Sequence, residues 1–378
     1  VCSSDLMSQL KRNNSQISET FVDHLEQHGV SRRGFLKFCS SMAAALALPT
    51  GSADVMAEAL SAAKRPTVIW LSFQECTGCT ESITRSHTPT IENLIFDFIS
   101  LDYHHTLQVA AGHQAEEARD MAMKDAYGKY LLIVDGSIPT KDGGVYSTIA
   151  GRTNLSMLEE AAAGAAAVIS VGTCAAYGGL PMAKPNPTGA VAVTDIVKDK
   201  PVMNIPGCPP IGLVMTSAIA HFLTFARLPD MDELGRPKAF YGDSIHDRCY
   251  RRTFYDQGLF AKAFDDEGAR KGWCLYELGC KGPTTHNACA TMKWNEGTSF
   301  PIESGHPCLG CSEPNFWDAG SFYEALSVPQ GRVGETVLKA AAVGVGVGVA
   351  AAALNRSNKS AAVEGRETMT VEDLKKES

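Results

Sequence analysis

The sequence lacks the features of several protein classes. Basic residues are fewer than acidic ones, 34 against 42, and the resulting net charge of −8 argues against nucleic acid as a partner. At most two apolar runs approach the ~20 residues of a membrane span, which excludes a polytopic membrane protein. Neither a G-x-G-x-x-G nor a Walker A loop is present, so a nucleotide is not the default ligand.

Composition is otherwise that of a globular protein with an excess of cysteine. Hydrophobic residues make up 44% of the 378 residues and charged residues 20%, which excludes disorder as the main state. The length suits about two domains of ~100–200 residues each. Twelve cysteines are many for an ordinary enzyme and few for a small disulfide scaffold, so the cysteines need a specific explanation.

Residues 1–63 are predicted to be an export leader. An arginine pair stands in Ser31-Arg32-Arg33-Gly34-Phe35-Leu36-Lys37, ahead of a weakly apolar stretch at 38–49. This stretch is shorter than the ~20 residues of a membrane span. The pattern is typical of a twin-arginine signal, with Ala57-Glu58-Ala59 as one cleavage candidate, and it places the folded protein in the periplasm. The alternative is an ordinary basic amphipathic helix.

The other end of the chain carries a second weakly apolar segment. Residues 335–355 are predicted to form a hydrophobic helix, in which Gly344 and Gly348 have the spacing that lets helices approach closely. We expect this helix to anchor the protein in a membrane, the alternatives being a buried helix or a flexible tail rich in alanine and glycine. Residues 356–378 are polar and are expected to form a disordered tail.

The body of the chain, residues 64–235, has the pattern of an α/β domain. Four apolar, β-branched runs alternate with helical patterns, which predicts a parallel sheet covered on both faces. The runs are residues 67–73, 130–134, 167–171 and 202–205, with helical patterns at 114–126 and 157–165.

Cysteines follow three of these runs at the point where each run ends. They are Cys76, Cys79, Cys174 and Cys208. Because the carboxyl ends of parallel strands meet at one edge of a sheet, residues far apart in sequence are expected to converge there.

Residues 236–330 are expected to form a second domain with little core of its own. Strand-like runs stop, and loops rich in glycine, proline, cysteine and histidine replace them. Such a segment needs something other than apolar burial to hold it together. Its candidate ligands are His246, Cys249, Cys274, Cys280, Cys289, Cys308 and Cys311.

Three kinds of chemistry compete for these residues, once Cys2 and Cys39 are set aside as part of the leader. Disulfides suit an exported protein with ten remaining cysteines, but two C-x-x-C pairs favour metal capture or redox chemistry. Structural zinc sites usually combine two C-x-x-C-type pairs, each local in sequence, whereas the first four cysteines come from three distant strand ends. This spacing argues against zinc. Iron–sulfur clusters accept scattered thiolates and also histidine, and we favour them.

Eleven ligands divide into two sets of four and one set of three. The first set is the strand-end group, and the second comprises His246, Cys249, Cys274 and Cys280. The third, with Cys289, Cys308 and Cys311, has three thiolates, which suits a three-iron cluster.

Six strings in this order resemble the small subunits of nickel–iron hydrogenases. The resemblance extends over about residues 65–325, and the arginine-pair leader supports it. The strings are Glu75-Cys76-Thr77-Gly78-Cys79-Thr80-Glu81, Gly172-Thr173-Cys174-Ala175, Ile205-Pro206-Gly207-Cys208-Pro209-Pro210, His246-Asp247-Arg248-Cys249, 272–283 (GWCLYELGCKGP) and Gly305-His306-Pro307-Cys308-Leu309-Gly310-Cys311.

The resemblance implies a flavodoxin-like parallel sheet domain followed by a loop-rich iron–sulfur cluster domain. It implies a proximal [4Fe-4S] cluster on the strand-end group, a distal [4Fe-4S] cluster on the second set and a medial [3Fe-4S] cluster on the third. Pro301 lies near the place where some relatives carry a fourth medial cysteine. Gly78 and Gly179 stand where oxygen-tolerant relatives carry two further cysteines, so their modified proximal cluster is not expected here.

The implied function is electron transfer in a hydrogenase. Nickel and iron would reside in a separate large subunit, and electrons from hydrogen oxidation would pass through the proximal, medial and distal clusters. A cytochrome b or another membrane acceptor would receive them. The alternative is an iron–sulfur carrier subunit of a respiratory complex without hydrogenase activity, related to cluster-bearing subunits of complex I that lack the second and third groups.

Overall fold

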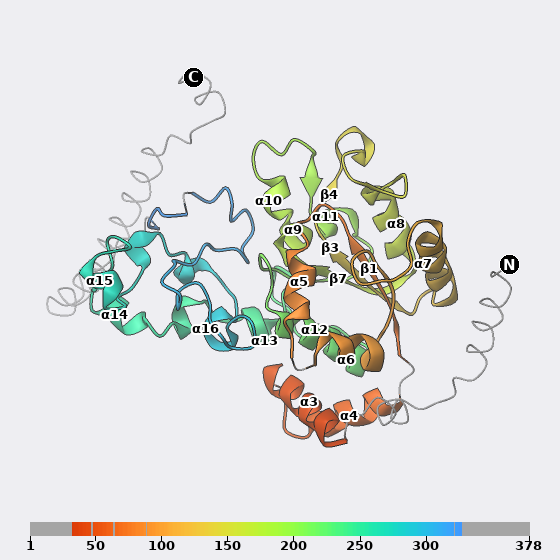
Figure 1. Cartoon of the computed structure of the whole chain (residues 1–378), viewed down its shortest axis with the longest axis horizontal. Helices are drawn as coiled ribbons and strands as arrows, with labels where there is room; N and C mark the ends of the chain where they lie inside the picture. Colours follow the sequence, from red (N-terminus) through yellow and green to blue (C-terminus); the bar gives the residue numbers. More distant parts are fainter. Residues whose placement is uncertain (1–31, 47, 63–64, 88, 321, 327–378) are drawn as a thin grey trace, which may run out of the picture.

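A five-stranded parallel sheet forms the centre of the molecule (Figure 1). The computed structural model describes residues 32–46, 48–62, 65–87, 89–320 and 322–326, so the predicted C-terminal helix, the tail and residues 1–31 lie outside the described residues. The strand order is β2-β1-β3-β7-β9, which is the flavodoxin-like order and confirms the expected fold class. The strands are β1 (Thr67–Ser72), β2 (Ser100–His104), β3 (Tyr130–Asp135), β7 (Ala165–Val171) and β9 (Val202–Ile205).

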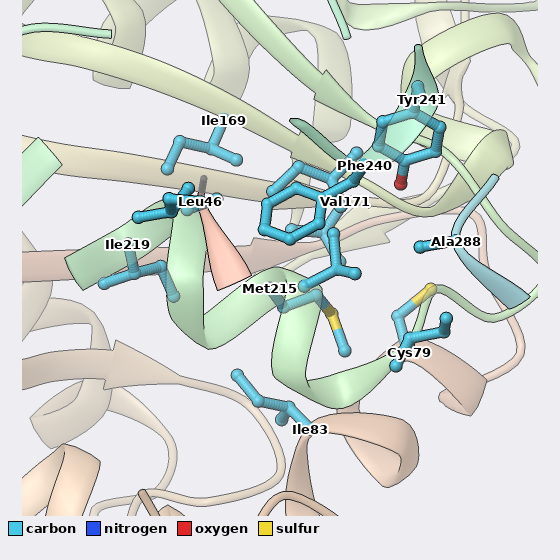
Figure 2. Packing of buried hydrophobic residues seen from close by; sticks show 14 of the residues in the cluster. Leu46, Cys79, Ile83, Ile169, Val171, Met215, Ile219, Phe240, Tyr241 and Ala288 are labelled. Carbon is cyan, nitrogen blue, oxygen red and sulfur yellow. The ribbon is translucent and has the colours of Figure 1, made fainter. Parts of the chain in front are cut away.

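Both faces of the sheet are covered by helices, as the continuous apolar runs predicted. On β3, Leu131 and Ile133 belong to one buried cluster and Leu132 and Val134 to another, because successive strand residues point to opposite faces. The first face packs on α5 (Gly78–Thr84) and α12 (Gly212–Phe225), and Figure 2 shows Met215 and Ile219 of α12 close to Ile169 and Val171 of β7. The second face packs on α7 (His113–Asp125), α8 (Asn154–Gly164) and α11 (Val193–Ile196).

β2 and α12 are among the elements of this domain that were not predicted from the sequence. β2 is an edge strand whose short sequence carries Asp102, so its apolar pattern is weak. α12 is apolar around most of its circumference, which is typical of a helix buried on more than one side.

The described part of the predicted leader is helical. α3 (Arg32–Ala45) and α4 (Ser52–Ala62) form a hairpin beside α12 (Figure 1). α3 is amphipathic, as the alternative interpretation of this stretch had it, and the export signal stays a prediction. Over the described ranges given above, no helix has the length and apolarity to cross a bilayer.

The second part of the chain consists of loops and short helices. After β9, the β-structure of the described residues is limited to isolated β-bridges, in line with the loss of strand-like patterns beyond residue 235. Its helices are α13 (Lys238–Tyr241), η3 (His246–Arg248), α14 (Arg252–Asp256), α15 (Glu267–Arg270), η4 (Tyr276–Leu278), η5 (Gly282–Thr284) and α16 (Cys289–Met292).

Short elements complete the first part. They are α6 (Ile91–Asn93), η1 (Leu94–Phe98), η2 (Lys141–Gly144), α9 (Gly172–Tyr177), α10 (Gly179–Met182) and the strand pairs β4 (Ile138–Pro139) with β8 (Ala190–Val191) and β5 (Thr148–Ile149) with β6 (Arg152–Thr153).

Candidate metal centres

The strand-end cysteines converge at the carboxyl edge of the sheet. Cys76 lies in the loop after β1, Cys79 in α5, Cys174 in α9 after β7, and Cys208 in the loop after β9. Burial, and then the neighbouring Cys208, raise the pKa of Cys174 to about 12, with a smaller contribution from Cys76. Cys79 is buried, whereas Cys76 and Cys208 are exposed. The group therefore opens to the surface on one side.

A glycine makes room for one of these sulfurs. Gly172 ends the β7 run with φ +82°, a conformation that favours glycine. A Cβ atom at this position would lie 2.5 Å from Sγ of Cys79, which is closer than real contacts allow. The sheet edge is therefore shaped around the sulfur atoms.

A buried carboxyl group that the sequence analysis did not single out faces this group. Asp135 ends β3, has no exposed surface, and neither of its carboxylate oxygens has a hydrogen-bond partner among the nitrogen and oxygen atoms of the described residues. Burial, and then the nearby Glu75, raise the pKa of Asp135 to about 8. A protonated Asp135 beside Cys79 can donate a hydrogen bond to a sulfur. The strand-end rule that selected the cysteines could also have selected Asp135.

The second set lies near the surface of the loop-rich part. Cys274 and Cys280 are buried and Cys249 is half-buried, and the proximity of Cys280 and Cys249 raises the pKa of Cys274 beyond the effect of burial. The His246 ring packs edge-on against Tyr255 at 4.3 Å between centroids. Burial lowers the pKa of His246, which favours the neutral imidazole that binds metals.

The backbone of His246 lies near one of the three thiols. A Cβ atom on Gly282 would lie 3.4 Å from Sγ of Cys280 and 3.8 Å from the backbone nitrogen of His246. His246 therefore lies on the same side of the loop-rich part as the second set of cysteines.

The third set lines one apolar cavity. Cys289, Cys308 and Cys311 surround a space of about 60 Å³ together with Pro301 and Phe300. Burial, and then the neighbouring Cys311, raise the pKa of Cys289 to about 12. Cys208 of the first set also lines this cavity, and Pro301 offers no ligand atom in its side chain. With Cys208 assigned to the first set, three thiols of the described wall are left for the third.

The third set lies between the other two. Cys208 of the first set and Cys311 of the third line the same cavity, and the nearby Cys311 raises the pKa of Cys208 beyond the effect of burial. On the far side, the Cys308 amide donates to Sγ of Cys280 at 3.4 Å. The order in space is first, third, second, which the order along the chain does not reveal.

Polar contacts join the two parts of the chain around this row. Thr173, next to Cys174, donates from Oγ1 to the Cys311 carbonyl oxygen. Arg236 donates to Asp232 at 2.7 Å and to Glu313 at 3.0 Å, and Glu313 accepts from the His286 amide at 2.6 Å. These contacts fix the third set against the sheet domain.

The chemistry of the donor set fits iron–sulfur groups. All cysteines in the described ranges are free, so the disulfide alternative has no support from the structure. Thiols with pKa values raised by burial are poor free nucleophiles, and a bound cation would deprotonate them. Within the described residues, no three His, Cys, Asp or Glu side chains are grouped tightly enough to hold a single metal ion.

Family models of known proteins match both parts of the chain. Residues 241–324 match the family model of the C-terminal part of the NiFe/NiFeSe hydrogenase small subunit, and residues 76–222 match that of NADH ubiquinone oxidoreductase, 20 Kd subunit. The chain is 50% identical over 313 residues to an uptake hydrogenase small subunit from Azotobacter vinelandii, covering 82% of this chain and 87% of the relative.

A further relative and a solved structure belong to the same kind of protein. The hydrogenase-1 small chain of Escherichia coli is 49% identical over 336 residues, covering 86% of this chain and 90% of the relative. Among solved structures, the reduced, active Ni-Fe-Se hydrogenase from Desulfomicrobium baculatum superimposes with a TM-score of 0.66 at 35% identity, covering 70% of this chain and 100% of that one.

Proposed function

Because the chain belongs to the small subunits of nickel–iron hydrogenases, we propose that its three ligand sets hold a proximal, a medial and a distal iron–sulfur cluster. The nickel–iron site of such enzymes resides in the large subunit, so this chain contributes electron transfer. The observation that supports the proposal best is the placing of the third set between the first and the second.

The ligand assignment follows the three groups. Cys76, Cys79, Cys174 and Cys208 hold a [4Fe-4S] cluster at the sheet edge. Cys289, Cys308 and Cys311 hold a [3Fe-4S] cluster in the apolar cavity, and His246, Cys249, Cys274 and Cys280 hold a second [4Fe-4S] cluster. When bound, each cluster takes up and releases single electrons.

The exposure of the two end groups offers an entry and an exit for electrons. The first set opens to the surface at Cys76 and Cys208, which leaves it accessible to a large subunit. The second set lies by the half-buried His246 and the exposed Asp247 and Arg248, where an acceptor can approach. Electrons from hydrogen oxidation therefore enter at the sheet edge and leave at His246.

The medial site gives a sharp test of the assignment. Replacing Pro301 by Cys adds a fourth thiol to the third set, and we expect a four-iron cluster with a lower potential. The three-iron EPR signal of the oxidised protein would then disappear. Ser304→Cys, with its thiol exposed and outside the cavity, should leave the signal unchanged. A wild-type protein without any three-iron signal would show that the ligand set is wrong.

The alternative of a respiratory carrier subunit is weaker. The match to the 20 Kd subunit of NADH ubiquinone oxidoreductase ends at residue 222, before the second and third sets begin. The hydrogenase small-subunit match covers residues 241–324, in which both of these sets lie.

We further propose that the mature protein acts in the periplasm, that the leader directs export by the twin-arginine route, and that residues 335–355 anchor the protein next to a cytochrome b or a similar acceptor. The arginine pair and the apolar stretch after it support export. The segmentation into leader, sheet domain, cluster domain, anchor and tail is part of the same proposal.

Export can be tested at the arginine pair. Changing Arg32 and Arg33 together to Lys keeps the charge but removes the guanidinium groups on which recognition depends. We expect the folded precursor to remain in the cytoplasm, as read by fractionation and immunoblotting. Lys37→Arg, an equally conservative change in the same helix, should be exported normally. Normal export of the double variant would rule out the twin-arginine route.

A further inference from the structure

The leader has the amphipathic pattern of a helix that packs on the rest of the protein, as well as the pattern of an export signal. On α3, the buried side chains Cys39, Met42 and Ala43 recur at helical spacing, and the buried Leu46 directly follows the helix. On the other side of the same helix, Ala44 is exposed. An export signal needs an apolar stretch, but it does not need one confined to a single face.

α4 repeats this arrangement. Met56 has no exposed surface and Ala57 is 8% exposed, whereas Val55 on the opposite side is 53% exposed. The two helices of the hairpin therefore turn their apolar faces inward, towards the rest of the chain.

α12 supplies the surface that receives the hairpin. The Oγ atom of Ser217 lies 3.3 Å from Sδ of Met42, and both residues are buried. Leu213 and Ala220 are four and three residues from Ser217 and share its side of α12. Met215 and Ile219 occupy the side towards the sheet, where Figure 2 shows them with Ile169 and Val171.

We propose that the α3–α4 hairpin is a ligand of its own chain, which docks on the Leu213, Ser217 and Ala220 side of α12 in the folded precursor and leaves this surface when the leader is removed. The inference builds on the proposed leader. Because the apolar face of α3 cannot be buried on α12 and bound by an export receptor at once, docking lowers the fraction of leader that is available for recognition.

The reactivity of Cys39 reports on docking, because its side chain has no exposed surface in the docked hairpin. In the purified full-length chain, alkylation of Cys39 by iodoacetamide, read by peptide mass spectrometry, should be at least about tenfold slower than in the denatured chain. Met42→Asp places a charge in the interface and should bring the rate close to that of the denatured chain. Ala44→Asp, on the exposed side, should label like the wild type.

A cross-link tests the same contact without disturbing the interface by a charge. In a Cys39→Ala background, Met42→Cys combined with Ser217→Cys should form a disulfide between leader and body on mild oxidation. Ala44→Cys with Ser217→Cys should not. Rapid labelling of Cys39 in the wild type, or equal cross-linking by both pairs, would overturn the proposal. Both readouts use the purified precursor, so a failure of docking is distinguishable from a failure of export.

Discussion

Replacing His246 by Gly is expected to lower hydrogen oxidation with an external acceptor by roughly 10–100-fold or more, while hydrogen–deuterium exchange continues at close to the wild-type rate. The first activity needs electrons to leave the protein, and the second does not. His246 is proposed as the ligand of the last cluster in the row, so its loss interrupts the exit and leaves the nickel site untouched.

The position of His246 explains why the effect is confined to the exit. The residue lies in η3, and the third set stands between the cysteines of its group and the first set. His246→Cys should behave differently from His246→Gly, because a thiolate adds negative charge, stabilises the oxidised cluster and lowers its potential.

A histidine outside the three sets provides the control variant for this prediction. His87→Gly removes an exposed histidine outside the three sets and should leave both activities unchanged. If an intact, iron-replete His246→Gly complex lost both activities equally, the exit role would be refuted. If it lost neither, His246 would be an ordinary surface histidine.

Gly172→Ala is expected to eliminate the proximal cluster and with it hydrogen oxidation. The new Cβ atom would lie 2.5 Å from Sγ of Cys79, so either the sulfur or the end of β7 has to move. A cluster tolerates little displacement of a ligand sulfur. Iron content should fall by about four atoms per chain, and uptake activity by about two orders of magnitude or more.

Gly128→Ala separates the steric effect from backbone strain. Gly128 has φ +77°, close to the +82° of Gly172, but a Cβ atom added there would have no other atom within 4 Å. Both substitutions carry a strain of roughly 1–2 kcal/mol, whereas the displacement of Cys79 occurs in Gly172→Ala alone. Full iron content in Gly172→Ala would show that the sheet edge does not hold a cluster as proposed.

The sheet and its cysteine edge were predictable because they depend on local patterns. Apolar runs fix the strands, and parallel strands bring their carboxyl ends together, so Cys76, Cys174 and Cys208 were expected to meet. β2 was missed because an edge strand is less buried, so its apolar pattern can be weaker than that of a central strand.

Relations between distant segments could not be derived in this way. The third set lies between the first and the second because Cys311 shares a cavity with Cys208 and Cys308 contacts Cys280. No periodicity or spacing gives that order, and the family resemblance alone implied it. The docking of α3 on α12 likewise depends on two apolar faces 175 residues apart, whose periodicities show that each is buried but not against what.

The central claim is that this chain carries three iron–sulfur clusters beside a nickel-bearing partner. It is tested most directly by metal analysis of the complex that co-purifies with the tagged chain. We predict about eleven iron atoms per copy of this chain, beyond the iron that accompanies nickel in the large subunit, together with nickel in the partner. Zinc at about four atoms per chain, or a complex without iron, would contradict the account.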